Sequence, residues 1–529
     1  MTGHYTRASN KGTVQVFLFI PFFIALLILN GCGSLPENIQ INPSFSYQDT
    51  GDTFLGKIVR NQGSTNPDQS GFFLLGDGLD AFVARAVLVD AAERSVDIQY
   101  YLYHNDLVGG LLAVKLMEAA DRGVRVRVLL DDIDTAGRDR NFAVLNSHPN
   151  IEIRLFNPFY RNRLRLPQFL TRFGKVTRRM HNKSFTVDNQ ATIVGGRNIG
   201  NEYFYADPDK NFGDLDVMAI GPVVKEVSGS FDLYWKSSLT YQVSSLYTKS
   251  LDKGSLDEAR NFYKSFMQEQ EHSPYMQALR NSTLANNLRN NKVSYAWGTA
   301  EALYDRPDKI SGINDSPDLH LASQLGEYFN DTNAEIIILS AYFVPGMEGV
   351  HFLAKLREKG VEIKVLTNSL ASTDVAAVHA GYAKYRRELL RAGIELYELK
   401  QSTADSENKM KISGSSGASL HTKSFVLDRK MLFIGSFNFD PRSYGQNTEI
   451  GLIFHSPQLA GMLGEYFDET ILGKAYKLEL VTTKEGNEVL KWLEQDGNRQ
   501  IVHYREPEAS LWRWLFARLA SILPIEEQL

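Results

Sequence analysis

The chain has 529 residues, with 57 basic and 62 acidic side chains, a formal net charge of −5 and one cysteine. At roughly 150 residues per domain, this length predicts several domains or one large double-domain core, and the composition excludes disordered, collagen-like and coiled-coil proteins. One cysteine cannot form an internal disulfide or a cysteine-based zinc site, and the small net charge argues against a protein coated with nucleic acid.

The N-terminus predicts a secretory signal segment over residues 1–31. An apolar run at residues 14–29 is shorter than the ~20 residues that cross hydrocarbon comfortably, and Pro21 interrupts it. An uncleaved membrane anchor is the alternative. Leu29-Asn30-Gly31-Cys32 resembles the bacterial lipobox, so Cys32 is the predicted site of lipid attachment. Both interpretations tie the chain to a membrane.

Residues 32–70 are polar and show no hydrophobic period, which predicts a tether. The next segments predict an α/β fold, because helical and strand patterns alternate along the chain. The expected helices and strands of this series are, in order, 79–93, 95–103, 109–121 and 124–130.

A second series of elements repeats the first, with a helix at 319–329, a strand at 334–339, a helix at 350–359 and a strand at 361–366. A repeat this long indicates a duplicated domain, so we expect two similar halves around a pseudo-twofold axis. The expected boundaries are 71–240 for the first half, 241–290 for a connection, 291–472 for the second half and 473–529 for a C-terminal extension.

The best-matched segments of the two halves share one motif. His181 to Asp188 and His421 to Asp428 both follow the pattern H-x-K-x4-D, and each is followed by a G-x-x-N run that ends at Asn198 or Asn438. On a strand, His and Lys two residues apart point to the same face. Two facing copies therefore bring together two imidazoles, two ammonium groups and two amides.

This set predicts phosphoryl transfer without metal or cofactor. One His attacks phosphorus and the other protonates the leaving oxygen, while Lys183, Lys423, Asn198 and Asn438 hold the phosphate oxygens. A nucleophilic imidazole needs a carboxylate on its second nitrogen. Asp216 and Glu449, which each begin an apolar strand, are the predicted orienting groups. For Asp188 and Asp428, a role in the following turn and a contact with substrate remain alternatives.

At these residues the chain resembles the phospholipase D superfamily. The runs Gly195–Phe204 and Val378–Tyr382, with Tyr385-Arg386, are similar to those of bacterial cardiolipin synthases, and the N-terminus and the length favour their C type. The resemblance implies two α/β halves, each a mixed sheet flanked by helices, with the active site at their interface. It also implies a phosphatidyl-histidine intermediate on His181, with His421 as the acid and base, and it includes Asp188 and Asp428 among the catalytic residues.

Three further segments are candidates for membrane or substrate contact. Residues 153–187 contain nine basic and no acidic side chains, interleaved with aromatic ones, which is typical of binding to anionic headgroups, although a solvated basic loop is the alternative. Residues 510–523 predict an amphipathic helix, packed on its own domain or on lipid. Residues 401–420, before His421, suggest either a lid or a segment without fixed structure.

The favoured function is a membrane-associated phosphatidyltransferase that acts on phospholipids such as phosphatidylglycerol, with phosphatidylethanolamine as a second candidate substrate. The alternatives are hydrolysis of phospholipids or nucleic-acid phosphodiesters by water, and a binding protein with an inactive site. Phospholipid is favoured over nucleic acid, and the sequence does not indicate whether there is a protein partner. The expected location is the bacterial cell envelope, anchored through the N-terminus, with the catalytic body in the periplasm.

Overall fold

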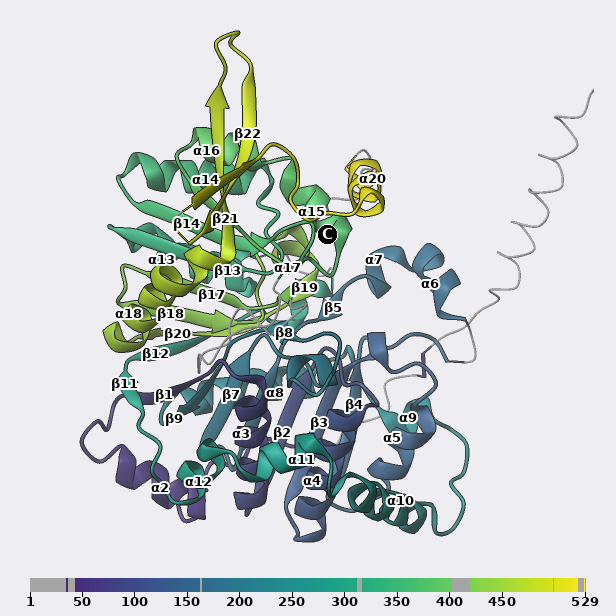
Figure 1. Ribbon diagram of the computed structural model, residues 1–529. Helices are drawn as coiled ribbons and strands as arrows, with labels where there is room; N and C mark the ends of the chain where they lie inside the picture. The colour runs from purple at the N-terminus through teal and green to yellow at the C-terminus, as the bar shows by residue number, and fades with distance from the viewer. Residues whose placement is uncertain are drawn as a thin grey trace, which may run out of the picture.

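In the computed structural model, two mixed β-sheets face each other and helices cover their outer faces (Figure 1). The structure describes residues 35–36, 43–161, 164–311, 316–401, 419–497, 499–521 and 528. The predicted signal segment, Cys32 and residues 402–418 of the predicted lid lie outside this part of the chain. The expected fold class, two α/β halves with mixed sheets flanked by helices, is confirmed.

The first sheet has nine strands in the order β10-β4-β3-β2-β6-β7-β9-β1-β11. Strands β2, β3 and β4 are parallel, and the other neighbours in the sheet are antiparallel. The strands are β1 (Ser70–Leu75), β2 (Ser95–Tyr100), β3 (Arg125–Asp131), β4 (Ile151–Phe156), β6 (Ser184–Val187), β7 (Ala191–Gly195), β9 (Asp216–Ile220), β10 (Thr240–Gln242) and β11 (Ala296–Gly298). Its helices are α3 (Gly78–Ala91), α4 (Leu107–Asp121), α5 (Asp139–Asn146), α8 (Val223–Trp235) and α9 (Val243–Leu246).

The second sheet has ten strands in the order β12-β20-β18-β17-β13-β14-β15-β21-β22-β23. Its strands are β12 (Ala300–Tyr304), β13 (Glu335–Ser340), β14 (Glu362–Asn368), β15 (Glu395–Leu399), β17 (Lys423–Leu427), β18 (Met431–Gly435), β20 (Ile450–His455), β21 (Ala475–Thr482), β22 (Glu488–Asp496) and β23 (Arg499–His503). Its helices are α13 (Leu321–Asp331), α14 (Gly346–Glu358), α15 (Ala376–Ala383), α16 (Arg386–Arg391), α17 (Pro441–Gly445), α18 (Pro457–Tyr466) and α19 (Leu472–Lys474).

The repeat is visible in equivalent turns. Helices α4 and α14 both end just before a glycine in the left-handed region, Gly123 with φ +94° and Gly360 with φ +93°. Glycine adopts this conformation without the steric cost that a Cβ atom brings. The next residues enter β3 and β14, which are parallel to β2 and β13, respectively.

The inner faces of the two sheets pack against each other through one shared hydrophobic core. Phe72 of β1 stacks on Phe454 of β20 with ring centroids 4.2 Å apart, and this core also includes Val217 of β9 and Ile434 of β18. Separate cores join each outer face to its helices. The central strands are buried on both faces, and β13 is accordingly apolar along most of its length. Strands β2 and β3 instead alternate, because they carry the buried polar residues Asp97, Gln99 and Arg127.

The folded body begins earlier than the predicted tether allows. Ser46 is buried, and its hydroxyl accepts from Arg127 Nη2 at 3.0 Å, while its backbone N–H donates to Asp232 at 2.9 Å. Helix α2 (Phe54–Gln62) follows. These partners lie far away in the sequence, so the polar composition of residues 43–70 gave no sign of them.

The connection between the halves is mostly helical, with α10 (Ser255–Gln270), α11 (Pro274–Arg280) and α12 (Thr283–Arg289) against the first half. The chain passes from one sheet to the other between β11 and β12. At the C-terminus, α20 (Leu511–Ala520) packs on α15 through Ala517 and Ala520. Among the described residues, no helix combines the length and the apolar character needed to cross a membrane.

Candidate active site

The two motif histidines follow short strands that pair across the two halves. His181 follows β5 (Arg179–Met180), which pairs with β19 (Asn447–Thr448) of the second half. His421 follows β16 (Ser419–Leu420), which pairs with β8 (Phe212–Gly213) of the first half. Figure 1 shows three of these strands, β5, β8 and β19, between the sheets. The backbone N–H of His181 donates to Thr448 O at 2.8 Å, and that of His421 donates to Gly213 O at 2.7 Å. Each histidine is therefore positioned by the opposite half.

Each imidazole contacts a carboxylate from the opposite half. His181 Nδ1 lies 2.8 Å from Glu449 Oε2, and His421 Nδ1 lies 2.7 Å from Asp214 Oδ2. Both carboxylates are fully buried. A carboxylate on Nδ1 fixes the ring orientation and leaves Nε2 for chemistry.

The predicted orienting role of Asp216 is wrong, because Asp214 holds that position. Asp216 Oδ2 instead accepts from the buried Arg85 Nη2 at 2.8 Å. The sheet register explains the two-residue error: Gly195 pairs with Asp216, whereas the equivalent Gly435 pairs with Gly451, two residues after Glu449. The sequence signal for Asp214 is the D-x-D spacing of Asp214 and Asp216.

Two serine hydroxyls and burial determine the protonation state of the Glu449 carboxyl group. Its carboxylate accepts from Ser436 Oγ at 2.5 Å and from Ser443 Oγ at 2.9 Å. Burial raises the pKa of Glu449 to about 7, although Lys183 and these hydroxyls act in the opposite direction. Burial also favours a higher pKa for Asp214, but His421 and Lys423 outweigh it, so the pKa of Asp214 is lowered. The two orienting carboxylates therefore differ in proton affinity.

Both motif lysines are buried beside their histidines. Lys183 Nζ donates to His181 O at 2.6 Å, and Lys423 Nζ donates to His421 O and lies 3.1 Å from His421 Nδ1. Burial lowers the pKa of Lys183 to about 7 and also lowers the pKa of Lys423. Burial, then Lys183, Lys423 and His421, hold the pKa of His181 well below its usual range. This mutual influence indicates that the two motifs form one electrostatically linked centre.

Aromatic rings that no sequence motif indicated enclose this centre. Tyr101, just after β2, contacts the His181 ring edge-on at 4.8 Å between centroids. Tyr203 and Phe212 each lie 5.2 Å from the His421 ring. Desolvation by such rings strengthens electrostatic interactions inside a site.

The two motif asparagines have different surroundings. Asn198 Oδ1 accepts from the backbone N–H of Leu102 at 3.2 Å, and its Nδ2 donates to the Tyr203 hydroxyl at 2.9 Å. Asn438 is also buried, but its Oδ1 has no hydrogen-bond partner among the described residues. Phosphate binding by these asparagines stays a prediction.

The expectation that Asp188 and Asp428 belong to the catalytic group is wrong. Asp188 follows β6, at the opposite end from His181, roughly 20 Å away along an extended chain. Its carboxylate accepts from the backbone N–H groups of Glu93, Arg94 and Ser95 at 2.7–3.0 Å. Asp428 accepts from Asn333, Ala334 and Glu335 in the same way. Each aspartate therefore holds the backbone at the start of a neighbouring strand by hydrogen bonds.

Asp188→Ala is expected to reduce the free energy of unfolding by about 1–3 kcal/mol, because it leaves three backbone donors without their acceptor. Turnover per folded molecule should stay unchanged. Asp428→Ala is the matched control in the second half, where a smaller loss is expected since the donors of Asn333 and Ala334 are solvent-exposed. Denaturant unfolding and kcat measure the two effects, and a large fall in kcat with unchanged stability would contradict the structural role.

Four of the nine basic side chains at residues 153–187 form ion pairs within the protein and are not available to a ligand. Arg161 and Arg165 pair with buried Asp132 at 2.6 and 3.3 Å, and Arg179 pairs with buried Asp131 at 3.0 Å. Arg154 pairs with Glu152 at 2.5 Å. These arginines stabilise the fold, so the interpretation of the block as an open anion-binding surface is wrong for them.

Comparisons with known proteins agree with this geometry. The family model described as "Cardiolipin synthase, PLD-like domain" matches residues 87–235 and 325–471, one match in each half. This chain belongs to that family. Its members include phospholipase D-like enzymes, so the protein is an enzyme of the phospholipase D family, as the resemblance implied.

Individual relatives cover most of the chain. It is 43% identical to cardiolipin synthase C of Escherichia coli (strain K12), over 88% of this chain and 97% of that protein. It is 24% identical to cardiolipin synthase B of Salmonella typhi, over 72% and 76% of the two chains. Among solved structures, phosphatidylserine synthase of Haemophilus influenzae shares the fold, with a TM-score of 0.56, 13% identity and coverage of 90% of this chain and all of that one.

Proposed function

We propose that this protein transfers a phosphatidyl group between phospholipid headgroups through a covalent phosphatidyl-histidine on His181. The observation that carries the proposal is the pair of buried histidines, each with Nδ1 against a carboxylate of the opposite half. The two rings can then perform different roles on one phosphorus atom. The names of its cardiolipin synthase relatives support phosphatidylglycerol as donor and acceptor, with phosphatidylethanolamine as a further candidate.

In the first step, His181 Nε2 attacks phosphorus and a P–N bond forms as the bond from phosphorus to the headgroup oxygen breaks. His421 gives its proton to the leaving oxygen, so the headgroup departs as an alcohol. Lys183 and Lys423 stabilise the negative charge on the phosphate oxygens in the transition state.

In the second step, the hydroxyl of the acceptor lipid loses its proton to His421 and attacks phosphorus. A new P–O bond forms, the P–N bond breaks and His181 is regenerated. Water in place of the acceptor lipid would give phosphatidic acid, so transfer requires that a lipid hydroxyl compete successfully with water.

The two carboxylates support His181 as the nucleophile. Burial and then Lys423 lower the pKa of His421, but the anion Asp214 opposes them and favours the protonated ring, which suits a group that must carry a proton. His181, whose pKa is held well below its usual range, is neutral and its Nε2 can attack. When Glu449 is ionised, it accepts the Nδ1 proton of His181 and leaves the Nε2 lone pair free.

The decisive experiment incubates the purified protein with phosphatidylglycerol, with and without phosphatidylethanolamine, in the presence of a chelator. Mass spectrometry of the lipids should find cardiolipin. Phosphatidic acid alone would favour the hydrolase, and loss of activity with the chelator would contradict a mechanism without metal.

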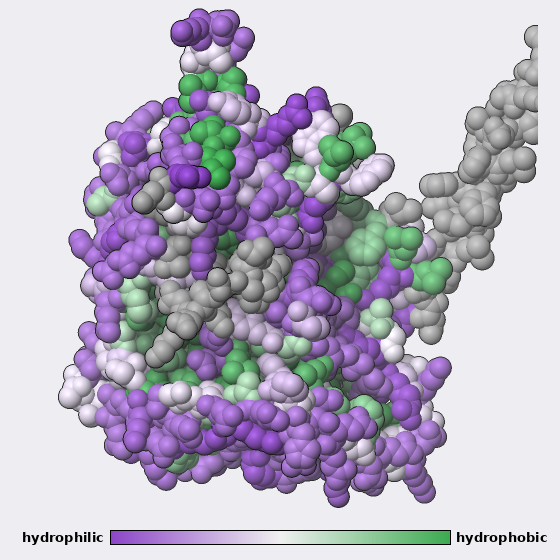
Figure 2. Space-filling view, viewed as in Figure 1, coloured by the Kyte–Doolittle hydropathy of each residue, from purple (hydrophilic) through white to green (hydrophobic). Residues whose placement is uncertain are grey.

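We further infer that the protein works on a membrane surface of the bacterial cell envelope. Leu164, which precedes α6 (Arg165–Thr171), Leu166 of α6 and Phe173 of α7 (Phe173–Val176) are exposed. One face of α20 is exposed too, with Leu511 and Trp512 at 84% and 80%. Figure 2 shows hydrophobic surface over α20 and near α6 and α7 on the same side of the molecule. Lipidation of Cys32 and a periplasmic location remain predictions, which the mass of the mature N-terminus would test.

Trp512→Gln combined with Leu511→Gln is expected to weaken binding to phosphatidylglycerol vesicles about tenfold or more, because burial of each large apolar side chain contributes about 1.5–3 kcal/mol. Both side chains are exposed, so the fold should be unaffected. Met347→Gln, at an exposed position of α14, is the matched control and should bind like the wild type. Vesicle co-sedimentation measures the effect, and equal binding by all three proteins would exclude α20 from the membrane contact.

A further inference from the structure

A cavity of about 530 Å³ lies in the first half, apart from the two histidines. Its floor is the outer face of β3 and β4, and its walls come from α4, α5 and α10. Helix α10 approaches α4 closely at one point, where a Cβ added to Gly110 would lie 2.8 Å from the Phe266 ring. Elsewhere α10 stands away from the sheet and leaves the cavity beneath it.

The interior of this cavity is apolar. Val126, Val128 and Leu130 of β3 and Ile153 of β4 form the floor, and Phe142 of α5 closes one side. Protein interiors are close-packed and contain few voids larger than a water molecule. A space of this size with an apolar lining is instead typical of a ligand site, since such sites measure roughly 300–1,000 Å³.

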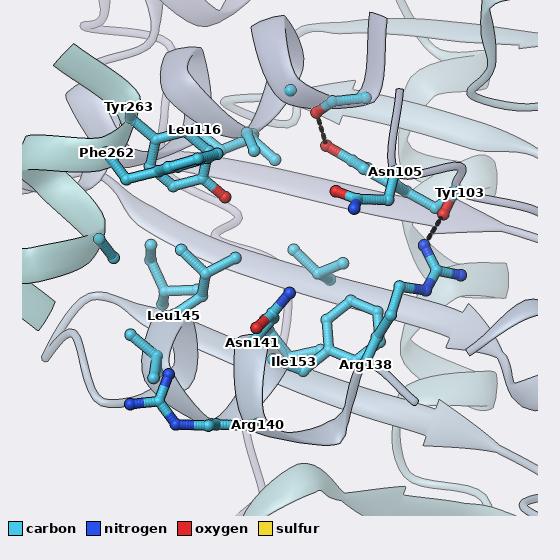
Figure 3. A pocket seen from close by; sticks show the side chains of 18 of the residues that line it. Tyr103, Asn105, Leu116, Arg138, Arg140, Asn141, Leu145, Ile153, Phe262 and Tyr263 are labelled. Atoms are coloured by element: carbon cyan, nitrogen blue, oxygen red, sulfur yellow. Dashed lines mark hydrogen bonds between the residues drawn. The ribbon is translucent and has the colours of Figure 1, made fainter. Parts of the chain in front are cut away.

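Polar groups are confined to the rim. Figure 3 shows the amides of Asn105 and Asn141 on opposite sides of the cavity and the Tyr263 hydroxyl pointing into it. Burial raises the pKa of Tyr263. Arg140 also lies at the rim, half-exposed and 4.0 Å from its acidic neighbour Asp252. The acidic Glu258 of α10 lines the same cavity, so an elongated apolar group complements this arrangement when its polar end lies at Arg140 and the two amides.

We propose that this cavity binds the acyl chain of an amphipathic lipid, with the apolar chain on β3 and β4 and the polar end at Asn105, Arg140 and Asn141. The site is distinct from the catalytic centre and does not depend on the reaction proposed above. A free fatty acid and a phospholipid both carry a long acyl chain, so both are candidate sources of the ligand.

Binding is tested with cis-parinarate, a long-chain fatty acid that becomes fluorescent in apolar surroundings, and the purified full-length protein. We expect saturable binding of one molecule and displacement by palmitate but not by octanoate. Ala259→Phe places a ring from α10 in the cavity and should weaken binding at least tenfold. Ser265→Phe, on the exposed side of the same helix, is the matched control and should bind like the wild type.

Two additional measurements complete the test. Displacement by lysophosphatidylglycerol as well as palmitate would assign the site to phospholipid chains, whereas displacement by palmitate alone would assign it to free fatty acid. A palmitate analogue with a photoreactive diazirine should label peptides of α5 or α10 in the wild-type protein, which keeps the test valid if Ala259→Phe does not fold. Labelling confined to other peptides, or equal binding by Ala259→Phe and Ser265→Phe, would overturn the proposal.

Discussion

His181→Ala is expected to lower kcat by about 10⁴-fold or more and to prevent any covalent intermediate, because no other group can take the place of the nucleophile. His421→Ala should lose turnover on natural lipids but still form the intermediate from a phosphatidyl ester of p-nitrophenol, which leaves as an anion and needs no proton. One burst of p-nitrophenolate and a phosphatidyl adduct on a peptide containing His181 are the expected observations. Mass spectrometry after rapid denaturation detects the adduct.

The same substrate distinguishes the two assignments of the histidines. An adduct on His421 in the His181→Ala protein would exchange the roles of the two residues. An adduct on neither residue in either variant would exclude covalent catalysis and favour direct attack by the acceptor. Thermal unfolding of both variants is the control, since each histidine contacts a buried carboxylate whose loss of a partner can destabilise the fold.

Glu449→Gln is expected to lower kcat by about 10²–10⁴-fold and to remove the rise of kcat/KM with pH on the acidic side. Burial raises the pKa of Glu449 to about 7, so at lower pH the carboxyl is protonated and no longer accepts the Nδ1 proton of His181. Raising the pH ionises it and restores the reactive tautomer. Glutamine at position 449 does not ionise, so kcat/KM of the Glu449→Gln protein should not rise with pH on the acidic side.

Asp214→Asn is the matched variant at the other histidine. It should also lower kcat, because the pKa of His421 falls when the carboxylate that favours its protonated form is lost. Its profile should nevertheless retain an acidic limb, since Glu449 still titrates. Identical pH profiles for the two variants would contradict the different roles given to the two carboxylates.

The sequence predicted the features that depend on local pattern and repetition. The apolar strands and the matched H-x-K-x4-D motifs identified the duplicated α/β fold, and Glu449 was identified because it precedes an apolar strand. The assignment of Asp216 failed because this residue begins β9, where Gly195 pairs with it, whereas the carboxylate at the site is that of Asp214, two residues earlier. A two-residue shift keeps a side chain on the same face of a strand, so the alternation of side chains does not distinguish them.

Interactions between distant segments were beyond sequence reasoning. Arg161 and Arg179 appeared as part of an uncompensated basic block, because their partners Asp132 and Asp131 stand well before them in the chain. The contacts of Tyr101 with His181 and of Tyr203 with His421 also join residues that lie far apart in the sequence, so no local pattern indicated them. Burial of a charge is decided by tertiary packing, which single-sequence patterns do not contain.

The exchange of short strands between the halves has a consequence for how such a site can arise. In a symmetric dimer of one half, each histidine would contact the equivalent carboxylate of the partner subunit. The two carboxylates would then have identical pKa values. Joining the halves in one chain allows the facing residues to diverge, here to Asp214 and Glu449, which hold their protons with different affinity. Covalent fusion thus permits one histidine to specialise as nucleophile and the other as proton donor.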